Sequence, residues 1–275
     1  YILEDSDCSV LFAGNDFATL VNQLEMDELQ TITIGPEWSE WIPGQTPPMQ
    51  ASAHFYSSHV TYDLPGVLPE PDEIFLQLYT SGTTSKPKGV PLTHFNVVAL
   101  LEQLRLEIPG FGTDSRNLVC APFFHIAGVG CLFLGLFGGA ANFVLPRFDP
   151  LAVIEGIGKL GLTHGLMVPA MQQAVISHPE ARKGDFHSLK HLIYGASPIS
   201  RSLLMASHSV LQCDYTQAYG LTETTGVATI LSMDDHRAIL SGQADHLAAS
   251  AGKPAAGIEM EIRNEDGICN AGESG

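Results

Sequence analysis

The sequence predicts an α/β protein in which layered, largely parallel sheets are flanked by helices. Two observations carry this prediction. Short apolar runs with strand character alternate along the chain with stretches of helical periodicity. Three polar, chemically rich loops, at 79–89, 194–198 and 217–225, each follow such an apolar run. Ligands of parallel sheets collect at the carboxyl ends of the strands, so we expect the three loops to line one crevice.

The first third of the chain contains an α/β pattern, a connection and a helix. Residues 1–35 have the pattern of an α/β unit, and the proline-rich passage over 36–73 indicates a connection. EIFLQL, residues 73–78, predicts a strand, and LYTSGTTSKPKGV, residues 78–90, a strand-to-helix loop. Residues 92–108 then predict a helix. Its buried face is expected to contain Val97, Leu101, Leu104 and Ile108.

The central stretch from Asn117 to Pro146 contains no Asp, Glu, Lys or Arg and is long enough to span a bilayer. Pro122, His125 and several glycines interrupt it, which favours a strand, a buried helix and a strand in the core of the protein. Beyond it, residues 149–176 predict a helix, a short strand and a helix. The stretches that begin near 189 and 213 each predict a strand followed by a loop.

Composition narrows the class of protein. The 275 residues are 45% hydrophobic and 16% charged, which is typical of a globular chain with a large core. The formal charge of −17 would repel a nucleic-acid backbone, while a small nucleotide could still bind in a local positive pocket. The five cysteines lack a Cys-x-x-Cys pair and predict reduced thiols in a cytoplasmic protein. No transmembrane segment is expected, which is compatible with peripheral membrane contact.

The loop at 78–90 has the composition of a phosphate cradle. Its glycines let backbone N–H groups converge, its hydroxyls donate hydrogen bonds, and its lysines supply positive charge. It is not a Walker loop, because Lys88 is followed by Gly89. Ser85 and Lys88 have the spacing of a serine acylase, but Pro87 disfavours the helix that this pair requires, and no Lys-Thr-Gly partner occurs.

Four motifs in order resemble the adenylate-forming superfamily, which includes acyl-CoA synthetases and peptide-synthetase adenylation domains. They are YTSGTTSKPKGV, PFFHIAG, YGASPIS and QAYGLTETTG, and they extend over nearly the whole chain. The chain departs from the usual phosphate loop at Ser85, where the family usually has glycine. The resemblance implies the fold of the large N-terminal domain of these enzymes, and a fatty-acyl-CoA ligase is the member that the chain resembles most.

The resemblance also implies a reaction. ATP activates a carboxylate as an acyl-adenylate, pyrophosphate leaves, and coenzyme A captures the acyl group. The residues that it implies for the β- and γ-phosphates are Thr80, Ser81, Gly82, Thr83, Thr84 and Lys88. Glu223 is the expected ligand of Mg²⁺. Lys88, Thr222, Glu223 and His125 are the expected catalytic residues.

The nucleotide is expected to contact further residues of the same motifs. Thr222 would bind the α-phosphate, the ring of Tyr219 would stack on adenine, and Gln217 would read the adenine amino group. Gly220 belongs to the same motif, and Gly195 and Ala196 would bring their backbone close to the base. Without the motif, Glu223 would be read as a solvated carboxylate and Tyr219 as a core aromatic residue. His125 would lie near the acyl carboxylate and gate its tunnel, or be a core histidine.

The expected substrate is a medium-chain or long-chain fatty acid. The stretch HIAGVGCLFLGLFGG offers no acidic side chain to pair with an α-ammonium group, so an amino acid is disfavoured. Three alternatives stay open: an aryl-acid CoA ligase, an amino-acid adenylation domain, and a non-catalytic nucleotide-binding module. The family resemblance further implies that residues 1–275 are part of the N-terminal domain. The ribose-binding aspartate, the hinge and the lysine of the C-terminal lid domain would then lie beyond Gly275, and the natural start before Tyr1.

Overall fold

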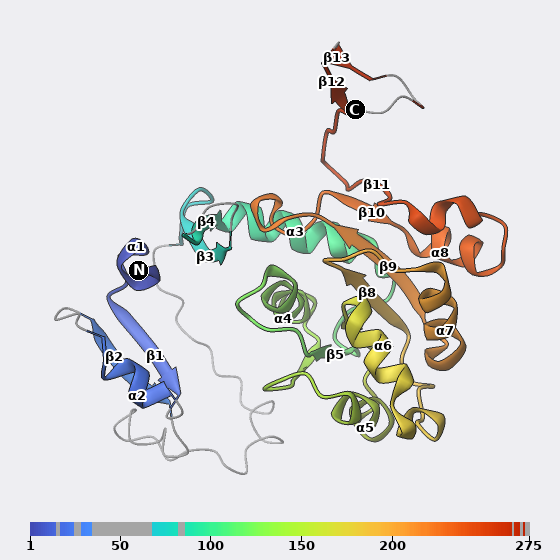
Figure 1. The fold of residues 1–275 in the computed structure, drawn as a ribbon, viewed down its shortest axis with the longest axis horizontal. Helices are drawn as coiled ribbons and strands as arrows, with labels where there is room; N and C mark the ends of the chain where they lie inside the picture. Colours follow the sequence, from blue (N-terminus) through green and yellow to red (C-terminus); the bar gives the residue numbers. More distant parts are fainter. Residues whose placement is uncertain are drawn as a thin grey trace.

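A seven-stranded, mostly parallel sheet forms the centre of the protein in a computed structural model (Figure 1). The structure describes residues 1–14, 17–24, 29–34, 68–81, 86–265, 267–269 and 272. In spatial order the strands are β11 (Lys253–Pro254), β10 (Thr229–Leu231), β9 (Asp214–Tyr219), β8 (His191–Gly195), β7 (His164–Leu166), β5 (Arg116–Val119) and β6 (Ala141–Val144). The five strands from β9 to β6 are parallel, and β10 runs antiparallel to β9 and β11. The predicted fold class is confirmed.

Helices cover both faces of this sheet. α3 (His94–Leu106) and α4 (Ile126–Gly138) pack in one apolar core. The helices of the other core are α5 (Pro150–Leu160), α6 (Pro169–Ser177), α7 (Arg201–Leu211) and α8 (Met233–Leu240). Alternation along β8 separates the two cores, because Leu192 and Tyr194 face the second core and Ile193 the first. Short 3₁₀ helices η3 (Pro179–Arg182), η4 (Thr222–Thr224) and η5 (Asp245–Ala249) join these elements.

Local sequence explains where the helices begin. The Thr93 hydroxyl accepts a hydrogen bond from the Asn96 N–H, and the Asn96 side chain accepts one from the Thr93 N–H, which forms a capping box for α3. At the start of α5 the Asp149 carboxylate accepts a hydrogen bond from the Ala152 N–H, and Pro150 follows it at the first helical position. The predicted apolar face of α3 is confirmed: Val97, Leu101, Leu104 and, just after the helix, Ile108 are all buried.

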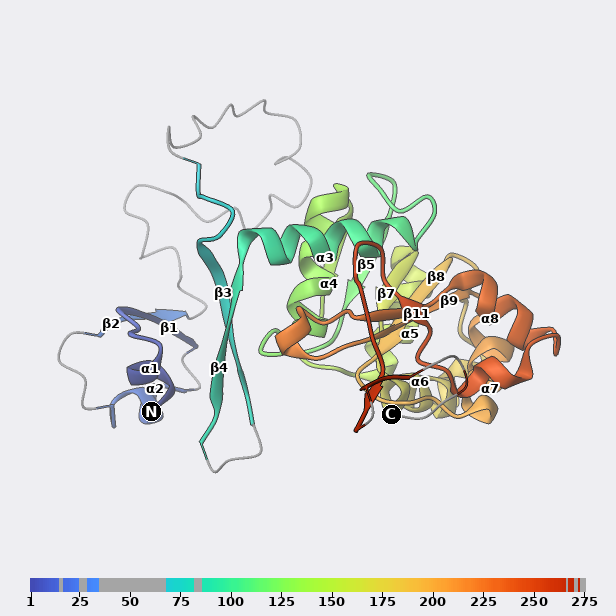
Figure 2. The same cartoon turned by 90° about the horizontal axis from the view of Figure 1, so that it is seen from above.

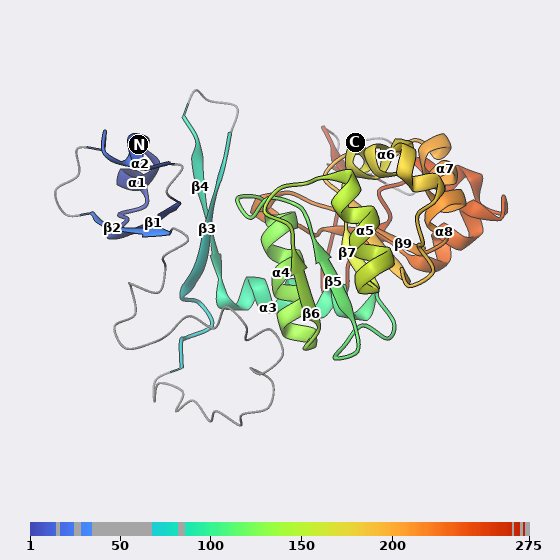
Figure 3. The same cartoon turned by 90° about the horizontal axis from the view of Figure 1, so that it is seen from below.

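The charge-free central stretch folds as predicted into a strand, a helix and a strand. β5 and β6 pair in parallel, and α4 between them packs against both strands (Figure 3). A Cβ atom at Gly128 would lie 2.1 Å from the Pro122 carbonyl oxygen, so glycine permits the close approach at the start of α4. Among the described residues, no helix is long and apolar enough to cross a bilayer.

The prediction of a strand-to-helix loop over 78–90 was wrong. Residues Lys88–Thr93 form a second strand, β4, that pairs antiparallel with β3 (Ile74–Thr80), and α3 follows β4 directly. This hairpin is separate from the seven-stranded sheet and stands beside the start of α3 (Figure 2). Lys88 pairs with Thr80 in the ladder. Gly89 suits the hairpin because a Cβ there would meet the side chains of Gln77 and Tyr79.

The amino-terminal residues form the predicted α/β unit. It comprises α1 (Ile2–Asp5), β1 (Val10–Gly14), α2 (Ala18–Val21) and β2 (Gln30–Ile34), and β1 pairs parallel with β2. The unit lies against the hairpin: Tyr79 Oη donates to Asp5 Oδ2 at 2.8 Å, and Tyr1 Oη donates to the Pro87 carbonyl at 3.1 Å. Near the other end of the chain, β12 (Arg263–Asn264) and β13 (Gly267–Ile268) form a small hairpin outside the main sheet. The five cysteines all lie in the described part of the chain, and none of them forms a disulfide.

Candidate active site

The end of the β3–β4 hairpin meets the loop after β9. The Thr80 hydroxyl donates a hydrogen bond to Glu223 Oε1 at 3.4 Å, across a sequence separation of 143 residues. Glu223 lies on the 3₁₀ turn η4 and is exposed, and Thr222 beside it is half-buried. Two of the predicted motifs therefore lie together. Of the three loops expected to line one crevice, those at 194–198 and 217–225 line a common pocket, whereas the hairpin reaches the third loop through the Thr80–Glu223 hydrogen bond.

Lys88 lies directly opposite Thr80 in the β3–β4 ladder, and its side chain is exposed. Among the described residues it has no ion-pair partner, so its ammonium is available to an anion. Ser81 follows Thr80 and is also exposed. Gly82, Thr83 and Thr84, predicted to bind phosphate, lie outside the described residues.

The carboxyl ends of β8 and β9 approach each other closely. A Cβ atom at Gly195 would lie 2.1 Å from the Ala218 carbonyl oxygen, and one at Gly220 would lie 2.6 Å from the Gly226 carbonyl oxygen. Glycine is therefore required at both positions. Ala196 adopts a left-handed conformation with φ of 62°. The predicted backbone sites Gly195, Ala196 and Gly220 thus line one cleft, which the side chains of ordinary residues would close.

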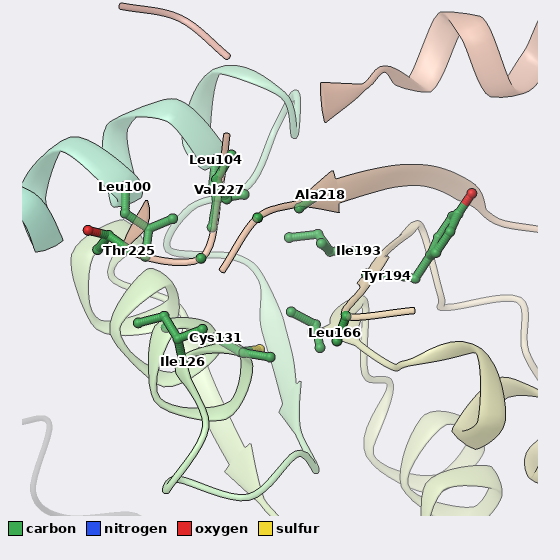
Figure 4. A pocket seen from close by; sticks show the side chains of 16 residues that line it. Leu100, Leu104, Ile126, Cys131, Leu166, Ile193, Tyr194, Ala218, Thr225 and Val227 are labelled. Carbon is green, nitrogen blue, oxygen red and sulfur yellow. The ribbon is translucent and has the colours of Figure 1, made fainter. Parts of the chain in front are cut away.

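This cleft is part of an apolar pocket of about 80 Å³, whose lining includes Gly195, Ala196 and Gly220 (Figure 4). Its side chains come from α3, α4, the ends of β7, β8 and β9, and the loop before β10. Those labelled in Figure 4 are Leu100, Leu104, Ile126, Cys131, Leu166, Ile193, Tyr194, Ala218, Thr225 and Val227. No charged side chain of a described residue lines it. Burial raises the pKa of the Cys131 thiol to about 11, so this residue is a neutral wall at ordinary pH.

Tyr194, Gln217 and Tyr219 lie near the carboxyl ends of β8 and β9, and of the three only Tyr194 lines the pocket. Tyr219 is 50% exposed, which leaves a face of its ring free to stack on a planar group. Gln217 is half-buried, and the terminal amide atom placed as Oε1 lies 3.2 Å from Tyr194 Oη. Tyr194 is itself buried and points its hydroxyl away from the apolar pocket (Figure 4). Burial holds the pKa of this phenol far above its ordinary value, so the hydroxyl keeps its proton.

His125 occupies the N-cap position of α4, and Ile126, the next residue, lines the pocket. Its imidazole is exposed and packs against the Phe124 ring with centroids 4.7 Å apart. It does not line the apolar pocket. The core-histidine alternative is wrong for this residue, since it lies at the surface beside the pocket.

Glu223 is the predicted metal ligand. Within the described part of the chain, no cluster of three or more His, Cys, Asp or Glu side chains could hold a metal ion. Mg²⁺ commonly binds one or two protein carboxylates together with substrate phosphates and water. The exposed Glu223 carboxylate beside the Thr80 hydroxyl fits this mode of binding and does not fit an all-protein cage.

Sequence reasoning missed the residues behind the cleft. Tyr194 Oη lies 2.8 Å from His236 Nε2 on α8, 42 residues away. Tyr194 directly precedes the recognised glycine turn, which was the available signal. Nothing in the sequence pointed to His236, because its contact arises only when α8 folds back against β8 and β9. Leu100 and Leu104 were predicted as core or helix residues, and they also form a wall of the pocket.

Comparison with known proteins identifies the family of this chain. Residues 1–275 match the AMP-binding enzyme family. The chain is 30% identical over 271 residues to the fatty acid–[acyl-carrier-protein] ligase ScoC of Streptomyces coeruleorubidus, covering 97% of this chain and 49% of that protein. It is 30% identical over 274 residues to the medium/long-chain-fatty-acid–CoA ligase FadD8 of Mycobacterium tuberculosis, covering 97% and 45%.

A solved structure shares the fold. The N-terminal domain of FACL13 from Mycobacterium tuberculosis superposes with a TM-score of 0.79 at 25% identity, covering 98% of this chain and 63% of that one. The chain spans about half the length of the two curated relatives. The family match over all 275 residues, together with the shared fold, shows that the chain belongs to the AMP-binding enzymes, the adenylate-forming ligases.

Proposed function

We propose that the protein containing this chain activates a medium-chain or long-chain fatty acid with ATP and transfers it to coenzyme A. The observation that supports the proposal most strongly is the Thr80–Glu223 contact. Gly220 and Thr225, on either side of Glu223 in the chain, line an apolar pocket without charged side chains from the described residues. Our assignment of the residues to roles combines this arrangement with the family resemblance.

In the proposed first step, a carboxylate oxygen of the acid attacks the α-phosphorus of ATP. A new P–O bond forms, the bond between the α-phosphorus and its bridging oxygen breaks, and pyrophosphate leaves. Lys88, Thr80 and Ser81 bind the phosphates that carry the departing charge, and Thr222 donates to the α-phosphate. Gly82, Thr83 and Thr84 complete this cradle. Glu223 would hold Mg²⁺, which supplies charge neutralisation for the triphosphate when bound.

In the proposed second step, a thiol attacks the acyl carbon. A thioester forms, the bond between the acyl carbon and the AMP oxygen breaks, and AMP leaves with that oxygen. The base of AMP would lie between the Tyr219 ring and the backbone of Gly195 and Ala196, with Gln217 at its edge. His125, next to Ile126 at the rim of the pocket, would guard the path of the acyl chain. We further propose that parts of the protein outside residues 1–275 supply a ribose-binding aspartate and a C-terminal lysine.

The pocket lining supports an acyl or aryl acid over an amino acid. A buried α-ammonium without a charge partner is costly, and no acidic side chain of a described residue lines the pocket. An aryl acid is the second candidate, because the apolar pocket would also accept a planar ring. ScoC, by its name, passes its acyl group to a carrier protein. A carrier-protein thiol is therefore the alternative acceptor to coenzyme A.

The test is acid-dependent exchange of radiolabelled pyrophosphate into ATP by the full-length protein. Medium and long fatty acids should stimulate exchange more than acetate, aryl acids or amino acids do, since each buried methylene adds about 0.8 kcal/mol. A preference for aryl acids or amino acids would replace the fatty-acid assignment with that class. Tight ATP binding without exchange for any acid would support a non-catalytic nucleotide-binding module instead.

A further inference from the structure

A hydrogen-bond chain runs from α8 to Gln217, near the carboxyl end of β9. His236 Nδ1 lies 2.7 Å from the Ser232 carbonyl oxygen, His236 Nε2 lies 2.8 Å from Tyr194 Oη, and Tyr194 Oη lies 3.2 Å from the Gln217 amide. Tyr194 is 1% exposed and His236 is fully buried, whereas Gln217 is half-buried. The chain thus connects the sealed interior to a partly exposed residue near the carboxyl end of β9.

The positions of the protons in this chain follow from the chemistry of its members. A carbonyl oxygen can only accept, so His236 Nδ1 carries a proton that it donates to Ser232. Burial lowers the pKa of His236, so the ring is neutral and Nε2 is an acceptor. Tyr194 must therefore donate its single hydroxyl proton to His236 Nε2. The Tyr194 oxygen can then only accept further hydrogen bonds.

This assignment decides which way the Gln217 amide faces. The amide can be turned over with little change in shape, so the hydrogen-bond network determines which terminal atom faces Tyr194. Tyr194 has no proton left to donate to Gln217, so the amide must present Nε2–H to the Tyr194 oxygen. Its oxygen then faces away from Tyr194. The Gln217 side chain makes no other hydrogen bond with the described residues that could compete with this orientation.

We infer that the buried Tyr194–His236 pair orients Gln217 so that its amide oxygen accepts a hydrogen bond from the exocyclic amino group of adenine. The inference rests on the proposed use of ATP. Gln217 is two residues from the half-exposed Tyr219 ring, and in the ladder it lies beside Tyr194, one residue before Gly195. Tyr194 and His236 touch no substrate in this account. They are positioning residues for base selection.

The test compares ATP with inosine triphosphate as substrates for pyrophosphate exchange by the full-length protein. Inosine carries an oxygen where adenine carries the amino group, so the wild-type amide oxygen should reject it. In Tyr194→Phe the amide can turn freely, and the preference for ATP in kcat/KM should fall about fivefold to tenfold, the scale of one neutral hydrogen bond. The loss should arise mainly in KM for ATP.

A second variant makes a sharper prediction. In His236→Phe the Tyr194 proton is released and can be donated to Gln217, which turns the amide and presents Nε2–H to the site. The ratio of kcat/KM for inosine triphosphate to that for ATP should then rise further than it does in Tyr194→Phe. The Ser232 carbonyl keeps its hydrogen bond from the His236 backbone N–H in this variant.

Tyr215→Phe is the matched control. Tyr215 is equally buried on the same face of the sheet, and its hydroxyl lies 3.1 Å from Ser207 Oγ, without contact to Gln217. Loss of the Tyr215 hydroxyl should lower the stability of the protein without altering its preference for ATP over inosine triphosphate. Adding Tyr194→Phe to Gln217→Ala should also have no further effect on preference, because the orienting pair would have nothing left to orient.

The outcomes separate the two proposals. Unchanged preference in both Tyr194→Phe and His236→Phe, in a wild-type protein that catalyses exchange, would overturn the positioning role alone. Equal loss of preference in Tyr215→Phe would also overturn it, since general loosening would then explain the effect. No exchange with any acid in the wild-type protein would overturn the proposed function, and the inference with it.

Discussion

Lowering the pH from 7 to 5 should destabilise this fold through two buried histidines. His164 and His191 lie in neighbouring strands at the end of the sheet opposite the candidate site, and each is 4% exposed. Burial lowers the pKa of both to about 4, from an ordinary value of 6.5. For His191 the charge of Asp214 opposes the shift without cancelling it.

The sign and size of the effect follow from proton linkage. Because the folded pKa is depressed, the stability that these groups contribute is present above pH 6.5 and is lost as the pH falls toward about 4. At pH 5 the unfolded histidines are largely protonated and the folded ones largely neutral. Each should therefore lower the free energy of unfolding by about 2 kcal/mol between pH 7 and pH 5, about 4 kcal/mol together. His236, whose pKa is also lowered by burial, adds in the same direction.

Denaturant unfolding followed by far-UV circular dichroism at the two pH values measures this difference. The double variant His164→Gln, His191→Gln should be less stable at pH 7 but lose much less stability on acidification. His246→Gln, at an exposed position, is the control for the general effect of replacing a histidine by glutamine. An equal free energy of unfolding at pH 7 and pH 5 in the wild-type protein would refute the reasoning.

Three further predictions concern activity. Glu223→Gln should lower pyrophosphate exchange about a hundredfold, whereas the exposed Glu180→Gln should not; unchanged exchange at low magnesium in the Glu223 variant would remove that residue from the mechanism. Gly130→Leu should fill the pocket and shift the substrate preference toward shorter acids by about fourfold per excluded methylene. Gly130→Ala is the control and should not shift it, because its Cβ would lie 3.5 Å from Leu100, at ordinary contact distance. An unaltered chain-length profile in the leucine variant would place the acyl chain elsewhere. Residues 1–275 alone should form acyl-CoA far more slowly than the full-length protein, because the lid and the lysine that we propose to lie outside these residues would contribute to the transition state; comparable turnover would contradict the division of the site proposed above.

Much of the fold could be predicted because it depends on local patterns. The apolar period of α3 placed Val97 and Leu101 in the core, and the glycine-interrupted stretch gave β5, α4 and β6. β4 was missed because Gly89 and Pro91 are poor strand residues. Its pairing is imposed by β3 across the turn, and a single segment does not reveal such tertiary pairing.

The residues of the candidate site, too, could be predicted from the sequence only in part. The motif residues at Thr80 and Glu223 could be identified individually, but their contact depends on a hairpin and a sheet loop that meet only in the folded chain. Tyr194 could be noticed because it directly precedes the glycine turn, but its contact with His236 had no sequence signal and forms only when α8 brings the imidazole to it. Motifs thus indicated the residues expected to touch the nucleotide, and only the fold revealed the buried pair behind them.

The central claim, activation through an acyl-adenylate, is tested most directly by following oxygen. The full-length protein would be given a fatty acid labelled with oxygen-18 in its carboxylate, together with ATP, Mg²⁺ and coenzyme A, and the products analysed by mass spectrometry. Attack of the carboxylate on the α-phosphorus, followed by thiol attack on the acyl carbon, leaves one carboxylate oxygen on AMP. The account predicts labelled AMP and unlabelled pyrophosphate. Label in inorganic phosphate with formation of ADP, or acyl-CoA formed with unlabelled AMP, would contradict it.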